Sequence, residues 1–328
     1  MDAVRQPDGL LHAWEPDGRG GGRPLDWGAV GEPAAGDASW RWLHFDHSVA
    51  DVQEWMRTAS GLSELTVSVL LQSDPRPRCV PVDDGLVIIL RGVKLNPGSD
   101  PEDMVSIRLW VGARRVISLR MRRLLSVDDL NTAIRNGTGP ASPGEFVVML
   151  TDRLQERMRH VVEALYDRVD QLEDEVITES SVQQREQLAG MRRQTIAMRR
   201  FLSPQREALS RLAGERLAVL SDRDRLSLRE EYDHLTRMVE DLDAARERAS
   251  VIHESLASRL AEMTNQRMYI LSIVAAIFLP LSFVTGLLGV NVGGMPGAEN
   301  PYGFREVNLL LLAVGGAIWA IFRWRGWF

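Results

Sequence analysis

The chain has 328 residues, of which 45% are hydrophobic and 26% charged, with a formal net charge of -6. This length exceeds one compact core, so two or three structural units are expected. The negative charge argues against nucleic acid as a partner, because nucleic-acid binding normally needs a basic surface. The single cysteine, Cys79, excludes an intrachain disulfide and any zinc site built from several cysteines.

The N-terminal part of the chain predicts a mixed α/β domain, assigned to residues 1–143. Residues 1–36 are rich in glycine and proline, and we expect them to be flexible. They lack the apolar segment of a signal peptide, so the body should stay in the cytoplasm. Residues 41–46 alternate like a strand, and short strands bounded by turns are predicted over 79–82, 85–93, 104–111 and 115–119. Helices are predicted over 51–59 and 126–135, and a linker over 136–140.

This domain shows little sign of enzyme chemistry. His44 and His47 flank Asp46, a combination that could bind zinc. Residues three apart on a strand point to opposite faces, however, so ordinary histidines are favoured. The chain has no Walker phosphate loop and no dinucleotide-binding fingerprint. We therefore expect a regulatory or assembly domain and no enzymatic activity.

A helical region follows, assigned to 144–266 as a hairpin and a long stalk. Helices are predicted over 145–178, where an acidic patch at 173–175 favours a solvated face over a metal site, and over 181–202, ending before Pro204. A third helix is predicted to begin near Asp222 and reach Leu288, about 100 Å at 1.5 Å per residue. Its apolar seam repeats every seven residues: Leu228, Leu235, Leu242, Ala249, Leu256, Met263 and Ile270. Such a seam needs a partner surface, so self-association is expected.

Two apolar runs close the chain, and residues 267–328 are assigned to a two-helix transmembrane domain. The first run, 268–290, has 23 uncharged residues and meets the roughly 20 that a spanning helix needs. Pro280 interrupts it, but neighbours in a membrane bundle can satisfy the freed carbonyl. The second run, 307–322, is shorter. Interfacial residues extend it: Trp319, Arg323, Trp324, Arg325 and Trp327.

The flanking charges predict the orientation of these two helices. Three arginines lie at the outer ends of the two runs, whereas the connecting loop 291–306 has only Arg305. Positive charge favours the cytoplasmic side, so both termini are expected there and the loop outside. Glu299 and Glu306 in this loop would attract cations.

The end of the first run, residues 278–291, reads FLPLSFVTGLLGVN and resembles the CorA superfamily of divalent-cation transporters. That family carries a Gly-x-Asn signature, usually Gly-Met-Asn, and Gly289-Val290-Asn291 has valine in the middle position. Further motifs look like its zinc-transporting ZntB branch, at residues 76–78, 137–140, 198–206 and 292–297. The resemblance covers about residues 40–328.

The resemblance implies a funnel-shaped homopentamer in the bacterial cytoplasmic membrane, with α/β cytoplasmic domains, a long-helix stalk and two C-terminal transmembrane helices. It implies transport of a divalent metal cation, above all Zn²⁺, with Mg²⁺, Co²⁺, Ni²⁺ and Cd²⁺ as other cargoes. The expected partners are these cations, the lipid bilayer and further copies of the chain. No tightly bound cofactor is expected.

The pore implied by this resemblance has a filter at Gly289, Val290 and Asn291. Amide oxygens of Asn291 would accept hydrogen bonds from waters bound to the ion, so the ion need not lose its hydration shell. Spacing of three and four selects one helix face below the filter, which the family uses to line the pore: Asn265, Met268, Leu271, Ser272, Ala275, Leu279 and Ser282. Its bulky apolar members could gate the pore by dewetting.

Three hypotheses remain open. The first is a zinc transporter, coupled or not to protons. Neither apolar run contains an ionisable residue, so coupling would use cytoplasmic groups such as His253 or water. The second is a CorA-like magnesium and cobalt channel. The third is a membrane-anchored coiled-coil signalling or scaffold protein without transport.

Overall fold

The computed structural model describes residues 9–34, 39–82, 84–94, 103–178, 182–214, 218–290 and 300–326. The chain divides into two units, Met1–Glu254 and Ser255–Phe328, and helix α6 (Asp222–Leu288) belongs to both. The α/β domain, the long helix and the two C-terminal apolar helices are all present, which confirms the expected fold class. The finer division into three domains stays a prediction.

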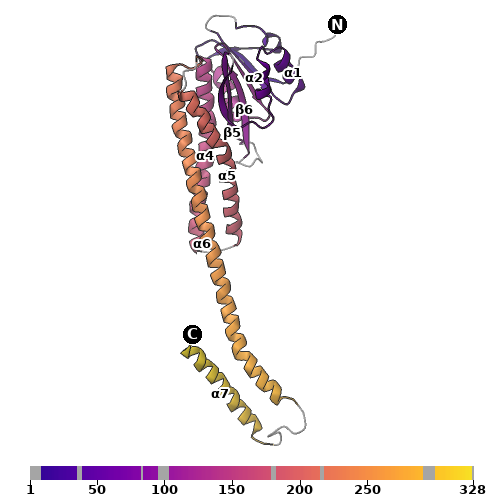
Figure 1. Cartoon of the computed structure of the whole chain (residues 1–328), viewed down its shortest axis with the longest axis vertical. Coiled ribbons are helices and arrows are strands. Elements are labelled where there is room, and N and C mark those ends of the chain that lie inside the picture. The colour runs from indigo at the N-terminus through magenta and orange to yellow at the C-terminus, as the bar shows by residue number, and fades with distance from the viewer. Residues whose placement is uncertain are drawn as a thin grey trace. The chain divides into compact units, whose positions relative to one another are not determined.

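The first unit contains a seven-stranded sheet at one end, beside the long helices (Figure 1). Its strands are β1 (Leu10–Pro16), β2 (Gly22–Pro24), β3 (Arg41–Asp46), β4 (Arg78–Val82), β5 (Gly85–Val93), β6 (Met104–Val111) and β7 (Arg115–Arg120). Their order is β2-β1-β3-β7-β6-β5-β4, with β3 and β7 parallel and all other neighbours antiparallel. The five strands predicted from alternating apolar residues correspond to β3 to β7.

Alternate residues of each strand face two helical layers. The helices are α1 (Ala50–Thr58), α2 (Glu64–Leu70), α3 (Leu125–Arg135), α4 (Pro143–Thr178) and α5 (Val182–Gly214). On one face Phe45 joins a buried core with Val52 of α1 and Val67 of α2. On the other face the ring of Trp42 lies 5.1 Å from the ring of Phe146 in α4. The strands are therefore apolar on both sides, as expected for a sheet covered by two helical layers.

One expectation about these elements is wrong, and several elements were not predicted. The strands β1 and β2 and the short helix η1 (Trp27–Ala29) lie within residues 1–36, for which no element was predicted. The helix α2 was not predicted. Helix α5 does not stop before Pro204 but contains it. Proline inside a helix costs about 3 kcal/mol, and burial of apolar residues on both sides of it, Leu202 and Leu209 among them, offsets this cost.

The first half of the α6 seam is buried within the single chain. Leu228, Leu235 and Leu242 are each at most 1% exposed. The predicted need for other copies to cover this part of the seam is therefore wrong, because α4 and α5 of the same chain provide the partner surface (Figure 1). Further along, Met263 is 36% and Ile270 61% exposed, so the seam continues beyond these partners.

Ion pairs hold α6 to its two neighbours. Arg248 Nη2 lies 2.6 Å from Glu173 Oε2 of α4, and Arg199 Nε of α5 lies 2.7 Å from Asp243 Oδ1. The acidic patch at 173–175 thus provides an interhelical partner through Glu173. The start of α6 is fixed by a capping pair with Ser221, whose Oγ accepts a hydrogen bond from the backbone N–H of Asp224 at 3.1 Å.

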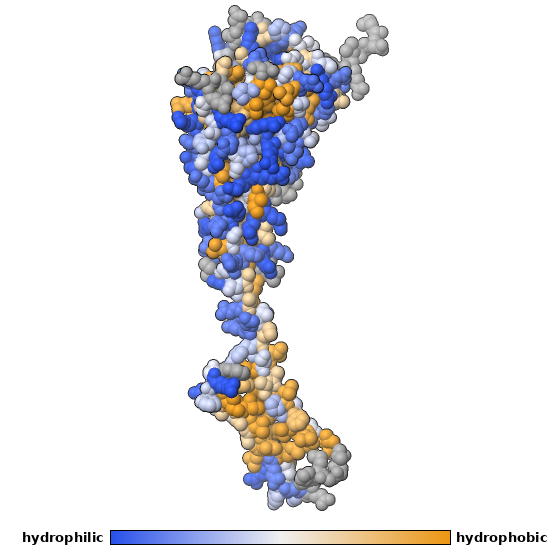
Figure 2. Space-filling model, in the orientation of Figure 1, coloured by the Kyte–Doolittle hydropathy of each residue, from blue (hydrophilic) through white to orange (hydrophobic). Residues whose placement is uncertain are grey.

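The second unit contains the end of α6 and helix α7 (Gly303–Trp324). Both are long and apolar enough to cross a membrane, in agreement with the two predicted spans. Figure 2 shows apolar side chains over the surface of these helices. Such a surface is stable in lipid or against other apolar helices, which makes this chain a membrane protein.

Candidate ion pathway

The predicted pore-lining residues lie on the C-terminal part of α6, which remains one helix through Pro280. All seven side chains are exposed in the single chain: Asn265, Met268, Leu271, Ser272, Ala275, Leu279 and Ser282. Leu271 is 69% and Leu279 72% exposed. The polar member Ser272 donates its hydroxyl to the carbonyl of Met268 at 2.8 Å. Its oxygen keeps acceptor capacity for water.

A cavity of about 530 Å³ lies between α6 and α7 of the second unit. Ser282 and Thr285 line it from α6, and Asn308, Gly315 and Gly316 line it from α7. Gly315 and Gly316 have no side chain to fill this space between the two helices. Ser282 therefore lines an interhelical cavity in the single chain. Thr285 and Asn308 were not predicted, since their proximity depends on how two helices pair.

The described end of α6 shows why glycine suits position 289. The N–H of Gly289 donates to the carbonyl of Thr285 at 3.0 Å. A Cβ at Gly289 would lie 3.0 Å from the same oxygen, so a larger residue would crowd the last helical turn. Its φ is not left-handed, so close approach explains the glycine better than backbone freedom does. Val290 follows, 49% exposed. Asn291 lies outside the described residues.

The outer loop is described only from residue 300 onward, and Glu299 lies outside that part. Glu306 is in the first turn of α7, where a carboxylate is favoured by the helix dipole. The side-chain amide of Asn300 donates to both of its oxygens, at 3.3 and 3.2 Å. The side chain of Glu306 is thus held in place, and its predicted attraction of cations stays a prediction.

Charged and aromatic residues mark the far end of α7. The guanidinium of Arg323 lies 5.9 Å from the ring of Trp319, within range of a cation–π interaction. Trp319 and Trp324 are 56% and 87% exposed. This arrangement is typical of the interface between lipid tails and headgroups, where tryptophan and arginine are enriched.

The strand histidines form no metal site. His44 Nδ1 is 2.8 Å from Ser118 Oγ, and His47 Nε2 donates to the carbonyl of Leu71 at 2.9 Å. Burial lowers the pKa of both histidines, that of His44 well below its usual value, so both remain neutral. Across the residues that the structure describes, no three histidine, cysteine or acidic side chains are placed to hold a metal.

An α/β unit, a long helix and two apolar C-terminal helices together define a class of membrane transporters. The chain belongs to the CorA family, since the model described as "CorA-like Mg2+ transporter protein" matches residues 37–324. It is 40% identical over 331 residues to the divalent cation transporter CmaX of Pseudomonas aeruginosa, covering all of both chains. It is 34% identical over 316 residues to the zinc transport protein ZntB of Pectobacterium carotovorum, covering 96% of this chain and 95% of that one.

Solved structures agree with this assignment. The structure of full-length CmaX matches with a TM-score of 0.86, 40% identity and 98% coverage of both chains. The CorA magnesium transporter of Methanocaldococcus jannaschii has the same fold at 20% identity, with a TM-score of 0.78 and coverage of 97% of this chain and 99% of that one. The predicted resemblance to the CorA superfamily and to its ZntB branch is confirmed.

Proposed function

We propose that this protein carries divalent metal cations, with zinc preferred, across the cytoplasmic membrane through a pore formed by several copies of α6. The observation that carries the proposal is the pairing of two membrane-length helices with family membership over residues 37–324. The relatives named for divalent cation and zinc transport support the choice of cargo.

The filter is proposed at Gly289, Val290 and Asn291, immediately after the last turn of α6. Removing the hydration shell of a divalent ion costs a large free energy. A neutral amide oxygen accepts hydrogen bonds from the hydration shell and binds weakly enough for the ion to leave. No fixed charge is needed within the spans, and neither apolar run contains one. The exposed face from Asn265 to Ser282 would line the pore below the filter.

The proposal is tested by metal uptake into liposomes that contain the purified protein. We expect Asn291→Ala to lower the initial rate at least about tenfold, equivalent to about 1.4 kcal/mol in the barrier, while the oligomer still assembles. Asn136→Ala is the control, since it removes an exposed side-chain amide from the first unit, outside the proposed pathway. Unchanged uptake in Asn291→Ala would remove the filter from the proposal, and no uptake by the wild type would favour a scaffold role.

The alternative cargo is Mg²⁺ or Co²⁺, which the description of the family model favours. Competition separates the two cargoes. If zinc is preferred, a given concentration of Zn²⁺ lowers uptake of a reporter ion more than the same concentration of Mg²⁺. The reverse order would assign the chain as a magnesium channel.

We further propose a homopentamer with both termini in the cytoplasm. The apolar surface of α6 beyond Met263 and the resemblance to CorA proteins support self-association. Native mass spectrometry of the protein in detergent would give the number of copies. For orientation, Cys79 is the only cysteine and is buried. A cysteine introduced at Asn300 in a Cys79→Ser background should react with an impermeant reagent added outside cells.

Proton coupling is a separate proposal, resting on the likeness to zinc-transporting relatives. Because the spans lack ionisable side chains, protons would have to move with water or through cytoplasmic groups such as the half-buried His253. Uptake into sealed vesicles with and without a pH gradient tests this. Equal rates in the two conditions would rule coupling out and leave transport itself untouched.

A further inference from the structure

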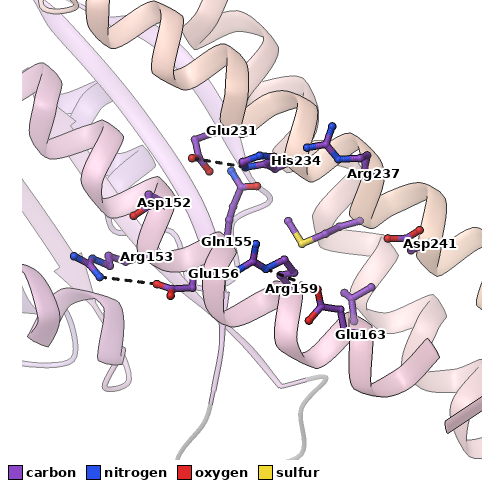
Figure 3. Close-up of a pocket in the computed structure, with 12 residues that line it drawn as sticks. Asp152, Arg153, Gln155, Glu156, Arg159, Glu163, Glu231, His234, Arg237 and Asp241 are labelled. Carbon is purple, nitrogen blue, oxygen red and sulfur yellow. Dashed lines mark ion pairs between the residues drawn. The ribbon is translucent and has the colours of Figure 1, made fainter. Parts of the chain in front are cut away.

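A cavity of about 500 Å³ lies between α4 and α6 within the first unit, far along the chain from the predicted filter. Gln155 extends from α4 toward Glu231 and His234 of α6 (Figure 3). The buried apolar side chains of Val162 and Met238 also line the cavity. Its volume falls within the range of about 300–1,000 Å³ that is typical of small-molecule sites.

Two of the polar side chains in this cavity are buried without hydrogen-bond partners in the described part of the chain. Gln155 is 3% exposed, and neither its amide oxygen nor its amide nitrogen is bonded. Glu231 is 8% exposed, and its Oε2 is likewise unpaired. The nearest basic group, Nδ1 of His234, is 4.0 Å from the other carboxylate oxygen. Unpaired buried polar groups cost about 1–3 kcal/mol each, so a ligand that donates hydrogen bonds would be favoured here.

The charge of the lining favours a cation. Five carboxylates and three arginines line the cavity, a formal excess of two negative charges when His234 is neutral. Arg153 and Arg159 are each engaged with a carboxylate on their own helix, Glu156 and Glu163, at 3.9 Å (Figure 3). These pairs leave the unpaired Oε2 of Glu231 as the buried acceptor for an incoming positive charge.

The geometry favours an organic cation over a metal ion. Within the described ranges, no three acidic, histidine or cysteine side chains are close enough to hold a metal, here or elsewhere. An ammonium or guanidinium group needs only acceptors, which Gln155 and Glu231 provide, and its hydrocarbon part would contact Val162 and Met238. We propose that the cavity between α4 and α6 binds a small organic cation, a protonated amine or guanidinium with an apolar body, through Glu231 and Gln155.

The ionisation of Glu231 gives this proposal a measurable consequence, the release of protons when a cation binds. Burial, together with Asp152 of α4 and Glu230 of α6, raises its pKa to about 7, while Arg159 opposes the shift. At pH 7 the carboxyl is therefore about half protonated. A bound cation stabilises the ionised form and lowers the pKa, so binding should release a fraction of a proton.

Calorimetric titration of the full-length protein in detergent tests the proposal. The probes are benzamidinium and n-butylguanidinium, with benzamide as the neutral isostere of the first. We expect saturable binding of at least one cation, with a dissociation constant of about 1 mM or lower, and none of benzamide. Glu231→Gln should weaken binding at least about tenfold, whereas Glu240→Gln, at an exposed position of the same helix that does not line the cavity, should leave it nearly unchanged.

Repeating the titration at pH 7 in buffers of different ionisation enthalpy measures proton release, which should be present in the wild type and absent in Glu231→Gln. Thermal unfolding checks that each variant is folded. If Glu231→Gln does not fold, Gln155→Met, which keeps the side-chain length, should weaken binding in its place. Three results would overturn the proposal: no saturable binding of either cation, equal affinities in the wild type and the folded variant, or binding of Mg²⁺ but not of the organic probes.

Discussion

Replacing Glu231 by glutamine should stabilise the first unit at alkaline pH. The variant keeps the shape of the side chain and removes a charge that is 8% exposed and lacks a partner at Oε2. Its pKa is about 7 in the folded protein and 4.5 in its ordinary state. A raised carboxyl pKa means that the folded state binds the proton more tightly. The contribution of this carboxyl to the stability of the fold is thus fully present below pH 4.5 and is lost as the pH rises through about 7.

The size of the effect follows from these two pKa values. The difference between 4.5 and about 7 corresponds to a destabilisation of about 3 kcal/mol at pH 8, of which less than about 1 kcal/mol is present at pH 5. For a unit of this size, 1 kcal/mol moves the melting temperature by roughly 2–4 °C. Glu231→Gln should therefore melt several degrees above the wild type at pH 8 and close to it at pH 5.

The assay is thermal unfolding of the full-length protein in detergent, followed by tryptophan fluorescence, since Trp14, Trp40 and Trp42 are buried in the sheet unit. Glu240→Gln is the matched control, because it removes the same charge from an exposed position on the same helix. Equal melting temperatures of wild type and Glu231→Gln at every pH would refute the reasoning. They would mean that water or a counter-charge already solvates this carboxylate.

Three other predictions can be checked with the same melting assay. Leu242→Ala should cost about 2–5 kcal/mol, since this side chain is 1% exposed, whereas Leu226→Ala, at a 63% exposed position of the same helix, should cost little. Burial holds the pKa of His44 well below 6.5, so stability is present above pH 6.5 and falls by up to about 1.4 kcal/mol per pH unit below it. This acid loss of stability should be smaller in the double variant Glu231→Gln/His44→Gln than in Glu231→Gln alone, a comparison in which Glu231 does not titrate. Gly20→Ala should cost about 1–3 kcal/mol, because φ is +103° and a Cβ would lie 2.6 Å from a backbone carbonyl.

Sequence patterns predicted the elements whose signals are local. The strands β5 and β6 are mostly apolar segments bounded by turns, and the periodicity of α6 led correctly to Leu288. The errors came where distant packing decides the outcome. β1 is held by pairing with β3, and α5 continues through Pro204 because its flanking apolar residues are buried. Neither partner can be inferred from the segment itself.

The candidate sites also combine residues that a local pattern indicates with residues that only the packing of helices brings together. The proposed pore face of α6 was chosen from the spacing of residues along one helix, and its role stays a prediction. Thr285 and Asn308 line one cavity from two helices, and Gln155 and Glu231 another. These combinations depend on which helices pack together and in what register, which a single sequence does not reveal. The composition of the filter came from the family resemblance, and its role stays a prediction.

The parallel pairing of β3 with β7 sets the order in which the sheet can form during synthesis of the chain. β3 is followed by three antiparallel strands before its second neighbour, β7, is synthesised, so the middle of the sheet cannot close until Arg120 has left the ribosome. At about 5–20 residues per second, the growing chain spends several seconds with one edge of β3 unpaired. The apolar end of α6 and helix α7 are synthesised last. A nascent chain stalled before residue 268 would therefore contain the whole sheet but neither membrane-length apolar segment.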